Sequence, residues 1–267
     1  MIASQQLLAI DIGNTQISCG VIEDSKLISE FRLGSDIDRT FDEYASLIKI
    51  MLADHANSKL AVVICSVVPP LTPIFEKISE RLLHTAPVII GPGVKTGMAI
   101  RLSDPSGVGA DRIANAVAAK EFFGCPSIVV DFGTATTFDV IGPAGDYIGG
   151  IISPGLNSSV QSLVDRTAKL PRIELQAPDK VIGKNTVQAM QSGAVWGYVC
   201  LVDGLIQKII EELEINDFNR KNVISTGGLG RLITPLSKNI SSYDPHLTLK
   251  GMEIIYTRVK ASENKEK

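Results

Sequence analysis

The stretch VVDFGTATTFDVI, residues 129–141, decides the fold of this chain. It begins as a continuous apolar strand, turns at the triplet DFG, and then places three threonines in a segment that is otherwise apolar. The stretch LLAIDIGNTQISCGVI, residues 7–22, has the same order: an apolar strand, an Asp-x-Gly turn and a second strand that carries hydroxyls. Continuous apolar strands are typical of sheets that are covered on both faces. The sequence therefore predicts the same hairpin twice, once at Asp11 and once at Asp131.

The segments that follow each hairpin predict two related α/β halves. We expect helices at 41–53, 71–83, 186–213 and from Ala110 onward, and further strands at 26–33, 59–68, 86–91, 146–154 and 222–226. Each half then has a mixed sheet that begins with a hairpin and continues with helix and strand. We place the domain boundary so that the N-terminal domain is 1–118 and the C-terminal domain is 119–267. The last six residues, SENKEK, are expected to be frayed.

The composition is that of an ordinary folded protein and argues against several classes. Of the 267 residues, 45% are hydrophobic and 21% are charged, which suits a globular chain of about two domains. The formal charge is −3 and the basic residues are dispersed, so no nucleic-acid partner is expected. No apolar run approaches the roughly 18 residues of a membrane span, and the N-terminus lacks the positive region of a signal peptide. The four cysteines are far apart and are expected to be reduced, which favours a cytoplasmic location.

Both Asp-x-Gly turns have the residue types of a phosphate site. Backbone N–H groups and hydroxyls that converge on one point form a nest for phosphate oxygens. An aspartate at the end of the preceding strand adds a ligand, or an orienter of water, for a cation that accompanies the phosphate. Asp, Gly and Asn are also common in hairpin turns that have no function. Two copies at matching places in two halves favour the functional interpretation.

A third element, NVISTGGLGRL at residues 222–232, ends a predicted strand with Gly227 and Gly228. Two glycines let the backbone approach a flat ligand such as adenine, although a flexible turn before a helix is an equal alternative. The sequence does not match the other common nucleotide-binding motifs. The stretch GPGVKTG, residues 91–97, lacks the GK[ST] ending of a Walker A loop and is not followed by a helix, as a dinucleotide fingerprint requires.

Two phosphate turns and a glycine pair are the pattern of the superfamily that contains acetate kinase, sugar kinases, Hsp70 and actin. Within it the chain resembles type III pantothenate kinases, through the motifs DIGNT, GVGADRIANAVAA, DFGTATTFD, GGIISPG, RTAKLP, IGKNTVQAMQSG and STGGLG. These occur in order from about residue 7 to about residue 230. The resemblance implies two actin-like, ribonuclease H-like domains. It also implies transfer of the γ-phosphoryl group of ATP to pantothenate, giving 4′-phosphopantothenate in the first step of coenzyme A biosynthesis.

The resemblance also assigns roles to residues. Asp111 would be the catalytic base that accepts the proton of the alcohol. ATP would contact Asp11, Ile12, Gly13, Asn14, Thr15, Gln16, Ile17, Ser18 and Thr134. Pantothenate would contact Gly109, Ala110, Asp111, Arg112 and Thr186. Asp131 would bind a monovalent cation, K⁺ or NH₄⁺, and Asp11 would hold Mg²⁺ through water.

The residues themselves leave alternatives for three of these roles. Asp111 could simply be a carboxylate stabilised by a helix N-terminus, which should lower its pKa and weaken it as a base. Phosphoryl transfer tolerates a weak base, because its loose transition state asks mainly for a positioned nucleophile. Arg112 could form a surface salt bridge instead of binding a carboxylate or phosphate bidentately. Thr186 could belong to a helix cap, with Asn185 as the capping residue.

Leu102 departs from the family pattern. Many members have RYDNP before the GADR block, and their tyrosine helps to hold pantothenate, whereas this chain has RLSDP with Leu102 in that place. Either another residue supplies the contact or the substrate has changed, so a related kinase with a different substrate stays open. A non-enzymatic ATP-binding accessory factor for transcription is also open, although it should lack Asp11, Asp111 or Asp131, and all three are present.

The predicted helix over 186–213 is apolar on most sides and carries three glycines. Such a helix is expected to be buried or to form an interface. The resemblance implies a homodimer with pantothenate sites at the subunit interface. This helix is therefore the candidate dimer element.

Overall fold

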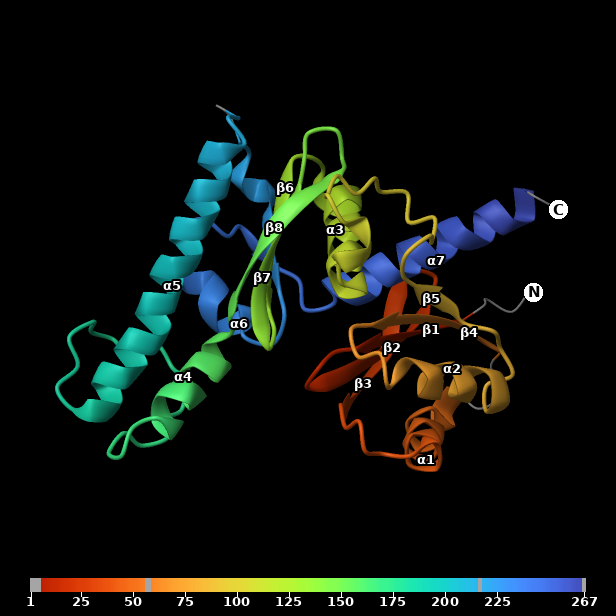
Figure 1. The fold of residues 1–267 in the computed structure, drawn as a ribbon, viewed down its shortest axis with the longest axis horizontal. Coiled ribbons are helices and arrows are strands. Elements are labelled where there is room, and N and C mark those ends of the chain that lie inside the picture. The colour runs from red at the N-terminus through yellow and green to blue at the C-terminus, as the bar shows by residue number, and fades with distance from the viewer. Residues whose placement is uncertain (1–5, 56–58, 216–217, 266–267) are drawn as a thin grey trace. The chain divides into compact units, whose positions relative to one another are not determined.

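The computed structural model describes residues 6–55, 59–215 and 218–265 and divides into two compact units. The first unit is Met1–Ala118 with His246–Lys267, and the second is Ala119–Pro245 (Figure 1). The strands are β1 (Gln6–Ile12), β2 (Gln16–Glu23), β3 (Lys26–Gly34), β4 (Leu60–Ser66), β5 (Val88–Ile90), β6 (Ser127–Phe132), β7 (Ala135–Ile141), β8 (Tyr147–Pro154), β9 (Val223–Thr226) and β10 (Ser242–Tyr243). The helices are α1 (Phe41–Met51), α2 (Thr72–Arg81), α3 (Ala110–Phe123), α4 (Leu156–Asp165), α5 (Thr186–Glu212), α6 (Gly230–Ile233) and α7 (Leu247–Lys265).

The first sheet has the strand order β3-β2-β1-β4-β5. β1, β2 and β3 form an antiparallel meander, and β4 and β5 continue the sheet parallel to β1. On one face Ile10 and Ile64 are fully buried against Tyr44 of α1 and Phe75 of α2. The polar end of Tyr44 donates to the carbonyl of Gly34 at 3.1 Å, so its burial leaves the hydroxyl satisfied. Covering on both faces explains why β1 and β4 are apolar without alternation.

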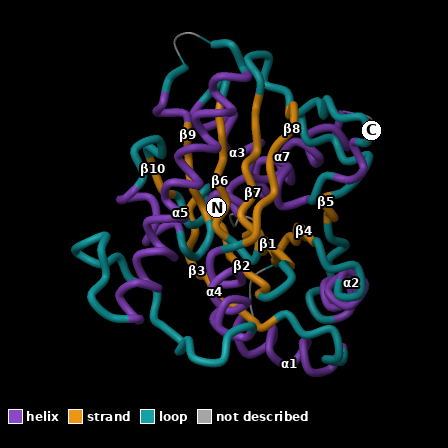
Figure 2. The backbone as a smooth tube through the Cα atoms, turned by 60° about the vertical axis from the view of Figure 1, so that its left-hand side comes forward, coloured by secondary structure: helices purple, strands orange, loops and turns teal. Residues whose placement is uncertain are grey.

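The second sheet repeats this topology in the order β10-β9-β6-β7-β8, and Figure 2 shows these strands side by side. β6, β7 and β8 form the antiparallel meander, and β9 pairs parallel with β6 as β4 does with β1. Val130 and Phe138 of the sheet are fully buried against α5, which contributes Val195 and Val202. The predicted fold class, two related domains that each have a mixed sheet and flanking helices, is confirmed.

The C-terminal helix α7 corrects the predicted domain assignment. The sequence placed residues 246–267 in the second domain, whereas the structure groups them with the first unit. α7 packs on β1, β2, β4 and β5 (Figure 1), and Leu249 lies against Gly20 of β2, where a Cβ atom would come within 2.8 Å of its Cδ1. The apolar residues Leu247, Met252 and Ile255 are buried there. The expected frayed tail is also wrong as far as Lys265, since α7 continues to that residue.

The long helix α5 is buried along one face, as its apolar sequence predicted. Val195, Val202 and Ile206 bury one face in the second core, whereas Val187 and Leu201 stay 41% and 39% exposed. Among the described residues it is the one helix long and apolar enough to cross a membrane by length and composition. A third of the 18-residue window that meets this test, 33%, is buried inside the structure. Because its buried face completes the core of a mixed sheet, we interpret α5 as a core helix with an apolar outer face.

Candidate active site

The first Asp-x-Gly turn joins β1 to β2 and is tied to the end of β3. The N–H of Gly13 donates to the carbonyl of Gln16 at 3.0 Å and closes the turn. The hydroxyl of Ser35 donates to the carbonyl of Gly13 at 2.6 Å, and the N–H of Ser35 donates to the carbonyl of Thr15 at 3.1 Å. Asn14, Thr15 and Gln16 are exposed, so the turn lies at the surface of the first unit.

Two of the predicted ATP contacts lie inside the first core. The side chains of Ile12 and Ile17 are fully buried and face α1 and α2. They flank the turn and fix its ends, so they could offer a nucleotide only main-chain atoms. Ser18 is half-buried on β2, where it pairs with Asp11 across the hairpin. The polar part of the predicted phosphate site is therefore residues 13–16 with Asp11 and Ser18.

The second Asp-x-Gly turn is brought together with the glycine pair inside the second unit. Gly227 has a φ of +83°, and a Cβ atom there would lie 2.5 Å from Oδ1 of Asp131 and 2.7 Å from the backbone N of Phe132. Glycine is therefore required at 227 both by the backbone conformation and by the closeness of Asp131. Thr134 is exposed at the tip of the same turn, and its carbonyl accepts from the hydroxyl of Ser158 at 3.2 Å. Gly227 therefore lies directly against the second Asp-x-Gly turn.

Two carboxylates and a thiol of the first unit lie together at the ends of β1 and β4. The parallel register pairs Asp11 with Cys65, so both side chains are on the same face of the sheet. The thiol of Cys65 is hydrogen-bonded to the Asp11 carboxylate and also lies in the field of Asp111. Burial and these two carboxylates hold the pKa of the Cys65 thiol well above its usual range, so the thiol is neutral and donates. The sequence predicted only that the cysteines are reduced; the position of Cys65 at the end of the strand beside β1 is the signal that could have placed it near Asp11.

Asp111 stands in the first turn of α3 and is partly removed from water. Burial raises the pKa of its carboxyl group above the ordinary value, and the N–H and charge of Arg112 lower it by less. The N–H of Arg112 donates to Oδ1 of Asp111 at 2.8 Å. The alternative of a carboxylate with a lowered pKa is therefore not supported, because desolvation of the carboxylate is the largest influence and raises the pKa. A Cβ atom at Gly109 would lie 2.5 Å from Oδ1 of Asp111, so glycine leaves the space that this carboxylate occupies.

The loop that leads into α3 carries Leu102. Asp104 closes it, because its Oδ1 accepts from the N–H of Ser106 at 3.0 Å and from the Ser106 hydroxyl at 2.5 Å. Ala110 at the start of α3 is buried, and Leu102 is half-buried. An aliphatic side chain thus stands in this loop, within the first unit and close in sequence to Asp111.

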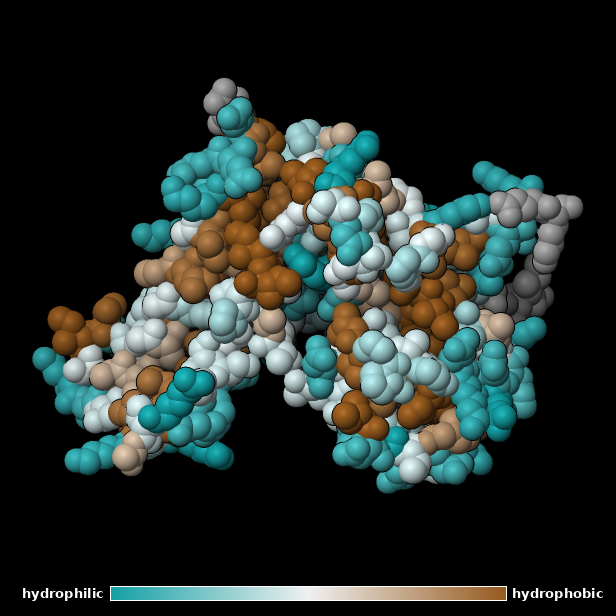
Figure 3. Space-filling model, viewed as in Figure 1, coloured by the Kyte–Doolittle hydropathy of each residue, from teal (hydrophilic) through white to brown (hydrophobic). Residues whose placement is uncertain are grey.

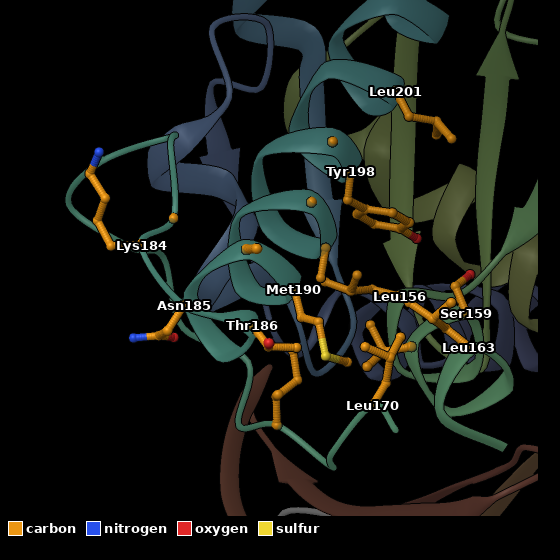
Figure 4. Close-up of a pocket in the computed structure, with 17 residues that line it drawn as sticks. Leu156, Ser159, Leu163, Leu170, Lys184, Asn185, Thr186, Met190, Tyr198 and Leu201 are labelled. Atoms are coloured by element: carbon orange, nitrogen blue, oxygen red, sulfur yellow. The ribbon is translucent and has the colours of Figure 1, made fainter. Parts of the chain in front are cut away.

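A cavity of about 850 Å³ lies in the second unit between α4, α5 and the segment that joins them (Figure 4). Thr186 lines it from the first turn of α5, and the hydroxyl of Tyr198 is hydrogen-bonded to Thr136 of β7. Asn185 accepts from the N–H of Gln188 at 2.9 Å, so the predicted helix cap is confirmed. Figure 4 shows Asn185 and Lys184 pointing away from the apolar part of the lining. That part includes Leu156, Leu163, Leu170, Met190, Tyr198 and Leu201.

Comparison with known sequences decides the family. A family model described as Type III pantothenate kinase matches residues 7–208. A Type III pantothenate kinase of Myxococcus xanthus is 48% identical over 259 residues, which are 96% of this chain and 100% of the relative. One of Dehalococcoides mccartyi is 45% identical over 256 residues, which are 95% of this chain and 98% of the relative. This chain belongs to the type III pantothenate kinase family.

Solved structures agree on the fold of this pantothenate kinase family member. MreB 5 of Spiroplasma citri, solved with AMPPNP bound, has a TM-score of 0.56 at 10% identity and covers 98% of this chain and 99% of its own. A conserved Campylobacter jejuni protein assigned to the Baf family of transcriptional activators has a TM-score of 0.59 at 20% identity, with 96% and 99% covered. At these identities the likeness shows the actin-like fold alone.

The family match spans most of the candidate site. It includes Asp11, Asp111, Asp131 and Thr186, and it stops before the Gly227 turn and before α7. Kinases of this fold use ATP and a divalent metal. Within the described part of the chain, no group of three or more His, Cys, Asp or Glu side chains could hold a metal ion. A single carboxylate such as Asp11 fits a Mg²⁺ ion that keeps most of its waters and rides on the phosphates of ATP.

Proposed function

We propose that the chain phosphorylates the primary alcohol of pantothenate with ATP, which yields 4′-phosphopantothenate and ADP for coenzyme A biosynthesis. The observation that carries this proposal is the family match over nearly the whole chain, with Asp11, Asp111 and Asp131 all in place. A cytoplasmic location stays a prediction from the sequence. The four cysteines, which are free thiols in the structure, are compatible with it.

Asp111 accepts the proton of the pantothenate alcohol and orients its oxygen toward the γ-phosphorus. Its raised pKa makes it a better proton acceptor than an exposed aspartate. The hydrogen bond from the N–H of Arg112 holds one carboxylate oxygen and leaves the other for the substrate. This arrangement suits phosphoryl transfer, which depends mainly on positioning and charge stabilisation.

Pantothenate is held by the residues around Asp111 and by Thr186. Gly109 and Ala110 offer main-chain groups, and Arg112 offers a guanidinium that pairs with the substrate carboxylate. Leu102 supplies an apolar contact to the gem-dimethyl group in place of the usual phenolic hydroxyl. These assignments rest on the resemblance of the motifs and on the place of each residue within its own unit.

The phosphates of ATP bind residues 11–18 and Thr134. Asp11 orients a water of the Mg²⁺ ion, which supplies the charge neutralisation that a lysine would otherwise give, since the turn at residues 13–16 has no basic residue. Asp131 binds a monovalent cation, K⁺ or NH₄⁺. The closeness of Asp131 to Gly227 supports a role for the glycine pair in the same nucleotide site.

The chain forms a homodimer through the outer face of α5. Apolar side chains are exposed there and beside the cavity, and Figure 3 shows apolar residues over α5 and β8 on the visible face of the second unit. These exposed residues include Ile152, Leu163, Val181, Ile182, Val187 and Leu201. A second copy would cover them, and Gly193 and Gly197 would let its backbone come close. Light scattering should give the mass of two chains, and a monomer with full activity would contradict a shared substrate site.

A coupled assay of ADP release with and without pantothenate tests the proposed function. We expect release that depends on pantothenate, Mg²⁺ and a monovalent cation. Release that depends on another alcohol, with none on pantothenate, would favour the related-kinase alternative, which the leucine at position 102 supports. A protein that binds ATP and transfers no phosphoryl group would favour the accessory-factor alternative.

A further inference from the structure

The beginning of α7 is packed directly against the helix that carries Asp111. The hydroxyl of Thr248 donates to Oδ1 of Asn115 at 2.8 Å. Asn115 is fully buried, so this hydrogen bond satisfies an oxygen that has little access to water. One turn further along α7, Gly251 lies against Ala114. Both contacts are within the first unit, although the two helices are separated in sequence by the whole second unit.

Gly251 lets the two helices approach more closely than any other residue would allow. A Cβ atom there would lie 1.9 Å from the carbonyl oxygen of Ala114 and 2.5 Å from its carbonyl carbon. These are backbone atoms and cannot rotate away, so even alanine would require one helix to move. The separation of α3 and α7 is therefore set by backbone contact.

The contact lies on the face of α3 from which Asp111 projects. Ala114 and Asn115 are three and four residues after Asp111, and residues at these spacings lie on one side of a helix. α7 also packs on β1 and β4, whose ends carry Asp11 and Cys65. It therefore connects the helix of the proposed base to the strands of the first phosphate turn.

We propose that Thr248 and Gly251 are positioning residues that fix Asp111 relative to Asp11 for phosphoryl transfer, an inference that rests on the proposed function. Neither residue touches the reacting atoms. Their contribution is to hold the first turn of α3 in one place, because a displacement of about 1 Å of a reacting group costs on the order of 10²-fold in rate. Thr248 and Gly251 lie beyond residue 208, where the matched family model ends.

Thr248→Val tests the hydrogen bond, because valine keeps the shape of threonine and removes the hydroxyl. We expect kcat to fall about tenfold, which is less than the roughly 10²-fold loss for a full 1 Å displacement. KM for ATP should stay within about twofold of wild type. Thr248→Ser keeps the hydroxyl and should restore kcat. The matched control is Thr257→Val, since Thr257 is exposed on the same helix and its hydroxyl bonds only within α7, to Glu253. Gly251→Ala should lower kcat further, because α3 must move.

Hydrogen exchange of the wild-type and variant proteins without substrate gives a second readout that does not depend on turnover. We expect faster exchange in the peptide over residues 109–118 for Thr248→Val, and none of this change for Thr248→Ser or Thr257→Val. The proposal is overturned if Thr248→Val leaves both kcat and the exchange of this peptide at wild-type values, or if Thr257→Val has the same effect. Wild-type protein that does not phosphorylate pantothenate would refute the proposed function, and the exchange data would then decide the positioning role alone.

Discussion

Asp111 is the residue on which the proposed chemistry depends most directly. Asp111→Asn removes the proton acceptor and keeps the size of the side chain. Because nucleotide is assigned to other residues, we expect ATP binding to stay near wild type while turnover falls by roughly 10²-fold or more. Calorimetry with a non-hydrolysable ATP analogue and steady-state kinetics measure the two effects. A variant that phosphorylates pantothenate at nearly the wild-type rate would show that the base is another residue.

The same substitution should not destabilise the protein at neutral pH. Burial raises the pKa of Asp111 above its ordinary value of 3.8, so the folded state binds this proton more tightly than the unfolded chain does. The contribution of the group to stability is then fully present below the unfolded-state pKa and is lost as the pH rises through the folded-state pKa. Above the folded-state pKa wild type therefore carries a partly buried charge that asparagine lacks. Thermal melting should give Asp111→Asn a Tm at pH 7 equal to or above that of wild type, and a clearly lower Tm would contradict this account.

Leu102 is the residue at which substrate affinity should differ from relatives that have a tyrosine. A lost neutral hydrogen bond is worth about 0.5–1.5 kcal/mol, so affinity falls by no more than roughly tenfold. Leu102→Tyr should therefore lower KM for pantothenate more than it changes kcat. Initial-rate kinetics on the two proteins decide this. A tyrosine variant with unchanged KM and altered kcat would remove Leu102 from the substrate contact.

At the scale of single residues, the sequence identified candidate residues but did not predict the surroundings of their side chains. Asp11 and Asp111 were assigned roles because their motifs resemble those of the family. In the structure the negative charges of both carboxylates raise the pKa of the Cys65 thiol. The raised pKa of Asp111 could not be predicted, because it depends on how much water the fold removes from the carboxylate. The interaction of Cys65 with these carboxylates could not be predicted either, since they come from a different strand and a helix.

At the scale of elements, the second turn should govern the response to monovalent cations. Asp131→Ala removes the proposed cation ligand, so we expect the activation by K⁺ or NH₄⁺ to disappear while the dependence on Mg²⁺ remains. Gly227 leaves room for the carboxylate of Asp131, because a Cβ atom there would lie 2.5 Å from its Oδ1. Rates in sodium-only and potassium buffers measure the effect. Equal wild-type rates in the two buffers would count decisively against a cation at Asp131.

Helices and strands could be predicted where a sequence motif occurs twice or where an apolar pattern extends over many residues. The two hairpins, the strands beside them and α5 were expected within a few residues of their observed ends. The helices α4 and α7 were not predicted. α7 has no sharp polar and apolar faces in sequence, because Gly251 and Thr248 face α3 at positions where a simple pattern would place large apolar residues. Its role is visible only once the sheet is formed.

At the scale of the whole molecule, the chain returns to its first unit after completing the second. A division at one point in the sequence cannot describe this, which is why residues 246–267 were assigned to the wrong domain. The return places α7 against α3 and the first sheet. The first unit therefore includes α7, which contacts the helix that carries the proposed catalytic carboxylate.

The most direct test of the account is to identify the product. Phosphorus NMR and mass spectrometry of a reaction with ATP, Mg²⁺, K⁺ and pantothenate should show ADP and 4′-phosphopantothenate formed in equal amounts by wild type. Asp111→Asn in the same reaction should form the same product roughly 10²-fold more slowly or less. ATP that is consumed by wild type without any phosphorylated pantothenate, or product formed equally fast by both proteins, would contradict the account.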